Sequence, residues 1–439
     1  MRTFKVVAGF VLLAILTTML GSANAGSSPA PAAQAAPYTP KAGVIFNDPT
    51  IPHRRHDVLD HIVRSIRSTP KGAKIRFASW NFDAMRAADA LIDAHKRGVS
   101  VQVVVSGTIA TESFTKLQRR LAGPPRRTGE KRSFARRCRH SCRGGSTGTM
   151  HTKVLLFSKV GRVPNVVMFG SANLTILAGR RQWNDWRTLT RAGQAYDRLY
   201  DLFRQLRADE PRDQPWKVMS WDNHGAWAFP AIGVRPGPID RHFKAVKCVG
   251  VTGGAGNGHG RTKIRAAIAG VFDEYGVTVA KALRDLWDRG CDVKLVYGVM
   301  GNSIARILHD PSGRGPIPTR ELTDDPEGDG ELELYLHTKY FTINGVYGDK
   351  TNARVVFNGS PNWSVRALRG DEILVRTNSA RALVGIYNGH FERLFRSPYA
   401  HDRTTSPEEL VRGFPGHEKM ARLARQRGSD PASSVEQDW

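Results

Sequence analysis

The stretches MHTKVLLF (150–157) and LHTKYFTI (336–343) carry the same His-Thr-Lys triplet, and each triplet opens an apolar run. A single triplet of this kind is usually a surface histidine near a lysine. Two copies, one beginning at His151 and one at His337, raise a different interpretation. The chain would then contain a duplicated domain with one half-site in each copy.

The segments before the two triplets also match each other. KIRFA (74–78) begins an apolar run, followed by the helical pattern AMRAADALIDAHKRG and then by VSVQVVVSG. KIRAA (263–267) is followed in the same way by VTVAKALRDLWDRG and CDVKLVYG. Both copies therefore predict a strand, an amphipathic helix that ends at a glycine (Gly98 or Gly290), and a second strand.

The match continues beyond the triplets. NVVMFGSAN (165–173) and ARVVFNGSPN (353–362) have strand patterns, and AYDRLYDLFRQL (195–206) and LVGIYNGHFERLF (383–395) have helical ones. Strand, helix, strand, strand, strand and helix thus occur twice in the same order. This recurrence predicts a duplicated α/β unit.

The N-terminal residues 1–25, MRTFKVVAGFVLLAILTTMLGSANA, are typical of a secretory signal peptide. Arg2 and Lys5 precede a short apolar run, and Ala-Asn-Ala at 23–25 fits the cleavage pattern. An uncleaved membrane anchor is the alternative, but the run is too short and wrongly flanked. No later segment is apolar for long enough to span a membrane, so we expect a secreted, extracellular protein without a transmembrane segment.

The remaining chain divides by composition. Residues 26–40 are rich in Ala, Pro and Ser and predict a disordered leader. The 439-residue length suits two domains, and we expect them at 41–212 and 217–400, separated by the Pro- and charge-rich stretch DEPRDQPW. Residues 401–439 are polar and predict a loose tail.

Four cysteines in an exported chain suggest two disulfides. Cys138 and Cys142 are close enough in sequence to staple a loop, and Cys248 and Cys291 would then join two segments of the second half. The sequence allows three pairings and does not choose among them. Free buried thiols are the alternative. None of the four has the spacing of zinc ligands.

The net charge of +25 and the pI near 10.3 favour polyanionic partners, which include nucleic acid, anionic lipid surfaces and acidic wall polymers. Residues 119–143 hold ten Arg or Lys and a single acid, Glu130. This basic segment directly precedes His151, so we expect it at the rim of the pocket, where it would contact lipid headgroups or a nucleic-acid backbone. A solvated basic loop is the alternative.

Each triplet is followed by a Gly-Ser-x-Asn sequence. Residues i and i+2 of a strand share one face, so His and Lys of a triplet project together. The two half-sites then offer two imidazoles, two ammonium groups and two amides: His151, Lys153, Asn173, His337, Lys339 and Asn362. Lysines and asparagines can hold the non-bridging oxygens of a phosphodiester, while one imidazole attacks phosphorus and the other protonates the leaving oxygen.

These motifs resemble the phospholipase D superfamily, whose members carry HxKxxxxD followed by GSxN. The resemblance covers both halves. It implies an α/β fold of two tandem phospholipase D-like domains, each a mixed sheet flanked by helices, packed about a pseudo-twofold axis. It also implies a covalent phosphohistidine intermediate and no metal or cofactor. The chain departs from the motif because Ser158 and Asn344 replace its Asp, a mainly structural residue in the family.

The resemblance also suggests individual roles. In relatives, an acidic residue some ten positions beyond the GSxN asparagine orients an imidazole, and Asp185 and Glu372 stand at that place. Ser171 and Ser360 are predicted to bind substrate. The first copy more often supplies the nucleophile, so His151 is predicted to attack and His337 to act as the acid.

We therefore predict a secreted, monomeric phosphodiesterase of phospholipase D type, which hydrolyses phospholipid to phosphatidate and free headgroup at a membrane surface. A secreted, metal-independent nuclease on the same frame is the second hypothesis, and the charge of +25 favours it. A non-catalytic polyanion-binding relative is the third. The loss of both motif aspartates supports that third hypothesis, and the intact His, Lys and Asn pairs oppose it.

Overall fold

The computed structural model describes residues 38–107, 110–327 and 332–403. The predicted signal peptide, nearly all of the predicted leader and the tail beyond residue 403 lie outside these residues. The described residues belong to one compact unit that begins at Tyr38, so the division at 212–217 stays a prediction. Across the described ranges, no helix is long and apolar enough to cross a membrane.

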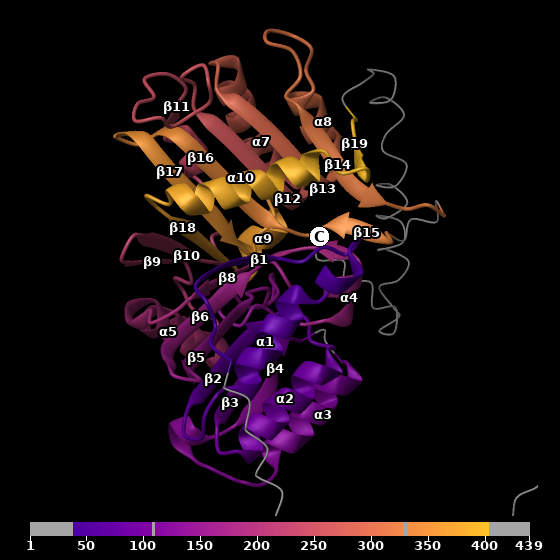
Figure 1. Ribbon diagram of the computed structural model, residues 1–439, viewed down its shortest axis with the longest axis vertical. Helices are drawn as coiled ribbons and strands as arrows, with labels where there is room; N and C mark the ends of the chain where they lie inside the picture. The colour runs from indigo at the N-terminus through magenta and orange to yellow at the C-terminus, as the bar shows by residue number, and fades with distance from the viewer. Residues whose placement is uncertain (1–37, 108–109, 328–331, 404–439) are drawn as a thin grey trace, which may run out of the picture. The chain divides into compact units, whose positions relative to one another are not determined.

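The first half is built on a seven-stranded mixed sheet, in the order β1-β8-β6-β5-β2-β3-β4 (Figure 1). Its neighbours β2, β3 and β4 run parallel, and the other pairs are antiparallel. The strands are β1 (Gly43–Phe46), β2 (Lys74–Ser79), β3 (Ser100–Ser106), β4 (Phe134–Cys138), β5 (Val154–Val160), β6 (Val163–Gly170) and β8 (Asp185–Leu189).

Helices cover both faces of this sheet, which is why its central strands are apolar almost throughout. Phe77 and Val103 face a core shared with the first three helices, whereas their neighbours Ala78 and Val104 face a core shared with α5. Figure 1 shows the first three helices grouped together and α5 apart from them. The helices are α1 (Asp57–Arg67), α2 (Met85–Lys96), α3 (Glu112–Ala122), α4 (Ile176–Arg180) and α5 (Gly193–Ala208), with short 3-10 turns η1 (Pro52–Arg54) and η2 (Gly129–Lys131).

The second sheet has twelve strands, ordered β7-β15-β14-β13-β12-β16-β17-β18-β10-β9, with β11 beside β16 and β19 beside β14. The strands are β7 (Gln182–Trp183), β9 (Lys217–Trp221), β10 (His224–Ala228), β11 (Val246–Lys247), β12 (Lys263–Val271), β13 (Asp292–Met300), β14 (Thr319–Asp324), β15 (Leu334–Leu336), β16 (Lys339–Tyr347), β17 (Lys350–Gly359), β18 (Ile373–Thr377) and β19 (Ala400–His401). The short β7 belongs to the first half of the sequence and pairs in parallel with β15 of the second half. This pairing joins the two halves.

Helices also cover both faces of the second sheet. Those near the parallel pair β12 and β13 share one core with it, and the last helix packs on the opposite face. They are α6 (Asp240–Lys244), α7 (Asp273–Asp288), α8 (Asn302–Leu308), α9 (Val365–Arg369) and α10 (Arg381–Phe395). The predicted α/β fold with a mixed sheet in each half is therefore confirmed.

The duplication is visible strand by strand. β2 pairs in parallel with β3 and antiparallel with β5, and β12 pairs in the same way with β13 and β16. The helices between the parallel strands are followed by Gly98 and Gly290, with φ of 100° and 91°. Only glycine adopts this left-handed conformation without strain, as the sequence predicts.

The residues that replace the motif aspartate have structural partners. Ser158 Oγ accepts a hydrogen bond from Lys74 N at 2.8 Å, and Asn344 Oδ1 accepts one from Gly256 N at 3.2 Å. Each side chain thus satisfies a backbone donor of a neighbouring segment. Both backbone donors are therefore paired although the carboxylates are absent.

The structure contains two disulfides, in one of the three pairings that the sequence allows. Cys138 bonds Cys142 and Cys248 bonds Cys291, so all four cysteines of the chain are used. The first closes a short loop after the edge strand β4, and the second ties the segment after β11 to the start of β13.

Candidate active site

The structure brings His and Lys of each triplet together as their alternation predicts. Lys153 Nζ lies 2.8 Å from His151 Nε2, and Lys339 Nζ lies 2.8 Å from His337 Nε2. Each ammonium also donates to the carbonyl of its own histidine at 3.1 Å. All six predicted residues are buried, which gives two polar half-sites shielded from water: His151, Lys153, Asn173, His337, Lys339 and Asn362.

Each triplet is bonded to the opposite half of the chain. His151 N and Thr152 Oγ1 both donate to Asp371 O at 3.0 Å. In the other copy, His337 N donates to Trp183 O at 3.0 Å. Each half therefore presents to the other's histidine the residue that follows this carbonyl, which is Glu372 in one case and Asn184 in the other.

His151 is paired with a carboxylate. Its Nδ1 lies 2.6 Å from Glu372 Oε1, and the two side chains are only 8% and 3% exposed. A buried acceptor at Nδ1 keeps the proton there and leaves Nε2 as the reactive nitrogen. Glu372 thus lies beside an imidazole, as the predicted orienting role requires. That imidazole belongs to the other half of the chain.

His337 is paired with an amide. Its Nδ1 lies 2.7 Å from Asn184 Oδ1. The orientation of that amide is fixed, because Asn184 Nδ2 donates to Ala178 O at 3.1 Å and to Gln182 Oε1 at 3.2 Å. Asn184 Oδ1 is therefore the acceptor, and His337 also carries its proton on Nδ1.

The predicted role of Asp185 is wrong, since this carboxylate contacts neither imidazole. Asp185 Oδ2 accepts hydrogen bonds from Tyr387 at 2.9 Å and Asn358 at 3.0 Å, and burial raises the pKa of the carboxyl. The strand register explains the error. Ser171 N donates to Asp185 O just as Ser360 N donates to Ile373 O, so Asp185 is the counterpart of Ile373 rather than of Glu372.

Ser171 and Ser360 hold the ends of strands. Their hydroxyls accept hydrogen bonds from Asp185 N and Ile373 N, each at 3.0 Å, and Ser171 Oγ also donates to Asn184 Oδ1. Both are fully buried. We therefore assign them a positioning role in place of the predicted contact with substrate.

A small pocket of about 10 Å³ opens beside His151, which is room for roughly one water molecule. Trp80, which the sequence analysis did not identify, lies edge-on to the His151 ring at a centroid distance of 6.0 Å. The lining residues are Trp80, Thr149, His151, Asn362, Ser364, Arg366, Ala367 and Glu372.

The short disulfide loop supports the segment that carries Glu372. Asp371 Oδ2 accepts from Cys142 N at 2.5 Å and from Ser141 Oγ at 3.0 Å. Burial raises the pKa of Asp371 to about 7, against the opposing effect of Arg143. Arg143, the last residue of the basic segment, is itself buried and donates to Phe229 O at 2.7 Å. This end of the basic segment therefore lies near the site, as expected. Its arginine packs inside the protein and bonds the backbone there.

Asp371 should make stability depend on pH. Its pKa of about 7 lies above the ordinary 3.8, so its contribution is complete below about pH 4 and is lost as pH rises through about 7. Asp371→Asn keeps an acceptor and removes the titration. Urea unfolding measures the free energy of unfolding of both proteins at about pH 5 and pH 8. From the lower to the higher pH, the natural protein should lose on the order of 3 kcal/mol more of this free energy than the variant. Parallel pH profiles for the two proteins would contradict this assignment.

Comparisons with known proteins identify one matching family description and solved structures of similar fold. The protein-family description "Cardiolipin synthase, PLD-like domain" matches residues 62–206. No curated protein matches the chain. Phosphatidylserine synthase of Haemophilus influenzae Rd KW20 is similar at a TM-score of 0.53 and 12% identity, over 85% of this chain and 92% of that one. Polyphosphate kinase from Porphyromonas gingivalis is similar at 0.51 and 14% identity over 88% of this chain, which spans only 55% of the kinase.

Proposed function

We propose that the chain acts as a member of the phospholipase D superfamily and cleaves phosphodiesters through a covalent phosphohistidine. One observation carries the proposal. Two buried His–Lys pairs are each bonded across the halves, one imidazole to a carboxylate and the other to an amide. That set supplies a nucleophile, an acid and two fixed cations.

The different partners of the two imidazoles favour different catalytic roles. The Glu372 carboxylate stabilises positive charge on His151, so His151 Nε2 is the better nucleophile and attacks phosphorus. The Asn184 amide fixes the tautomer of His337 without stabilising its charged form. A protonated His337 therefore gives up its Nε2 proton readily to the leaving oxygen.

Completion of the reaction uses the same groups. As the P–O bond breaks and the P–N bond to His151 forms, Lys153 and Lys339 lie beside the reacting nitrogens and stabilise the non-bridging oxygens. His337, now neutral, takes a proton from water, which attacks phosphorus and breaks the P–N bond. Both histidines return to their starting states. An alcohol in place of water would give phosphoryl transfer instead.

We propose a phospholipid as the substrate, cleaved to phosphatidate and free headgroup. The family description names a lipid-synthesising domain, which supports a lipid over other diesters. Export to an oxidising compartment is supported by both disulfides and by the signal-like N-terminus. A nuclease on the same frame is the second candidate, because a net charge of +25 favours polyanions.

The test is headgroup release from phosphatidylcholine vesicles in EDTA, with a labelled oligonucleotide assayed in parallel and His151→Ala as the control. Headgroup release that vanishes in the variant supports a metal-independent phospholipase D. Cleavage of the oligonucleotide alone, lost in the same variant, would replace it with the nuclease. Binding without turnover of either substrate would contradict both enzymatic proposals.

A further inference from the structure

A large cationic cavity lies apart from the catalytic pocket, at the outer edge of the first sheet. It encloses about 840 Å³ between the edge strand β4, the loop before it and the C-terminal part of α5. It shares no lining residue with the pocket beside His151. Two acids, Glu130 and Asp201, line it together with six cations: Arg132, Arg136, Arg204, Arg207, Arg212 and Lys217.

A second cavity of about 670 Å³ adjoins the first. The two share Gly129, Arg132, Phe134 and Arg136 among their lining residues, and the second adds two further arginines at 126–127. Together they form one continuous depression beside β4, which we call the edge trough. The middle of the basic segment therefore lines this trough and does not lie at the catalytic pocket.

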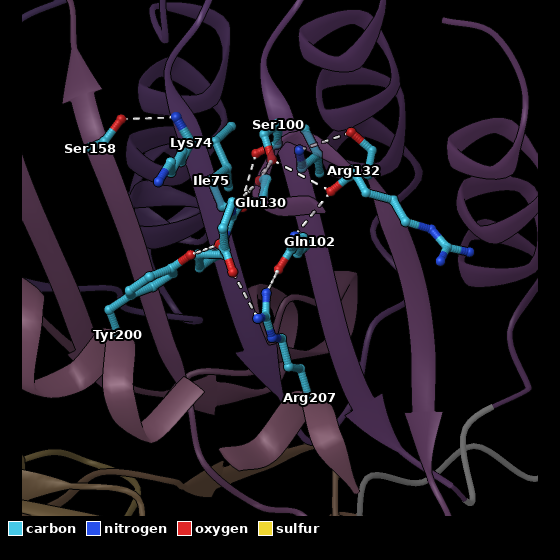
Figure 2. A network of polar contacts seen from close by, with 12 residues as sticks. Lys74, Ile75, Ser100, Gln102, Glu130, Arg132, Ser158, Tyr200 and Arg207 are labelled. Atoms are coloured by element: carbon cyan, nitrogen blue, oxygen red, sulfur yellow. Dashed lines mark hydrogen bonds and ion pairs between the residues drawn. The ribbon is translucent and has the colours of Figure 1, made fainter. Parts of the chain in front are cut away.

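The acids of the trough are already neutralised. Glu130 accepts from the Tyr200 hydroxyl and from Arg207 at 2.8 Å, contacts that Figure 2 shows, and these bonds lower its pKa to about 2. Asp201 lies 3.6 Å from Arg204. Within the described residues, the guanidinium of Arg132 has neither hydrogen bond nor ion pair, and Figure 2 shows it extended away from the network. Positive charge is thus left over.

The remaining cations crowd one another. Burial lowers the pKa of Arg136, and the charges of Arg132 and Arg207 lower it further. Burial lowers the pKa of Lys217; the charge of Asp201 opposes this effect, and three nearby arginines add to it. A bound anion would relieve this repulsion, so the chemistry of the trough calls for several negative charges.

The extent of the edge trough favours one class of anionic ligand over others. A depression that continues from one cavity into the next fits a chain better than a flat bilayer or a single headgroup. Its lining includes the half-buried ring of Phe134 and the exposed side chain of Pro125, which suit sugars and bases more than bare phosphate. We propose that the edge trough binds a single strand of nucleic acid through its phosphates, at a site separate from the catalytic pocket.

Binding is tested with a fluorescent oligothymidylate of about 20 nucleotides, in a His151→Ala background so that the probe is not cleaved. One variant removes three exposed trough cations: Arg132→Gln, Arg204→Gln and Arg212→Gln. The matched control removes three exposed cations of the second half, for the same change in net charge: Lys281→Gln, Arg306→Gln and Lys350→Gln. Vesicles containing phosphatidylglycerol are the second probe for all three proteins.

The trough variant should bind the oligonucleotide at least about tenfold more weakly at moderate salt. The slope of log affinity against log salt should become shallower by about 2, because each lost phosphate contact removes roughly 0.7 for single strands. The control should stay within about twofold of the parent protein. Equal losses in both variants, or no loss in the trough variant, would overturn the proposal. A loss confined to vesicle binding would overturn it in favour of a lipid site.

Discussion

Replacing His151 with alanine is expected to lower phosphodiester hydrolysis by at least about 10³-fold, because the variant lacks the nitrogen that bonds phosphorus. The loss should be the same for a natural lipid and for a p-nitrophenyl diester. An activated leaving group removes the need for an acid but not the need for a nucleophile. Steady-state rates with both substrates, and a thermal melt to verify folding, measure the effect.

His337→Ala is the matched comparison, since each histidine has its own Lys partner at 2.8 Å and both are buried. This variant should lose turnover of the lipid but still release one equivalent of p-nitrophenolate in a burst, which needs no proton on departure. His151→Ala should show no burst. A burst in His151→Ala and none in His337→Ala would reverse the two roles.

The second large effect is expected at Glu372. Glu372→Gln keeps the size of the side chain and an acceptor for His151 Nδ1, but it removes the negative charge 2.6 Å from the imidazole. The charged form of His151 then loses its stabilisation in the transition state. We expect kcat to fall by about 10²- to 10⁴-fold, the upper value being the loss found when the carboxylate behind the imidazole of a Ser-His-Asp triad is neutralised.

Asn184→Asp provides the opposite change, because it places a carboxylate behind His337. The new charge should raise the pKa of His337 and make it a weaker acid, so the basic limb of the pH profile of kcat should move to higher pH. If Glu372→Gln retained more than about a tenth of the original kcat, the charge would not be supporting the nucleophile. An unmoved pH profile in Asn184→Asp would remove the proposed difference between the two imidazoles.

The duplication and the His–Lys pairs could be read from the sequence because they are local. Alternation along a strand places His151 and Lys153 on one face whatever surrounds them. The helix between the parallel strands is equally predictable, from its periodicity and its terminal glycine. These features need no knowledge of how the two halves meet.

The orienting residues could not be read in the same way, because they depend on strand register and on contacts between the halves. Asn184 and Asp185 are neighbours, and only the pairing of β6 with β8 shows which of them faces His337. The family pattern also calls for an acidic residue, which favoured Asp185 over Asn184. The signal that could have found Asn184 is its match to Glu372 once the two GSxN strands are aligned by their pairing.

The basic segment shows a similar limit. Its charge is plain in the sequence, and its nearness to His151 suggested a place at the catalytic pocket. In the fold, β4 takes the segment along the edge of the sheet, so Arg143 reaches Asp371 while Arg132 lines the edge trough. Nearness along the chain does not determine which end of a strand a side chain occupies.

Trapping the covalent intermediate shows whether His151 carries the phosphoryl group during turnover. His337→Ala and the natural protein are mixed with a p-nitrophenyl diester, quenched in alkaline denaturant because phosphohistidine is labile in acid, digested, and analysed by mass spectrometry. We expect a phosphoryl adduct on the peptide that contains His151 in both proteins, with more of it in the variant. Turnover without an adduct, or an adduct on another residue, would contradict this role of His151.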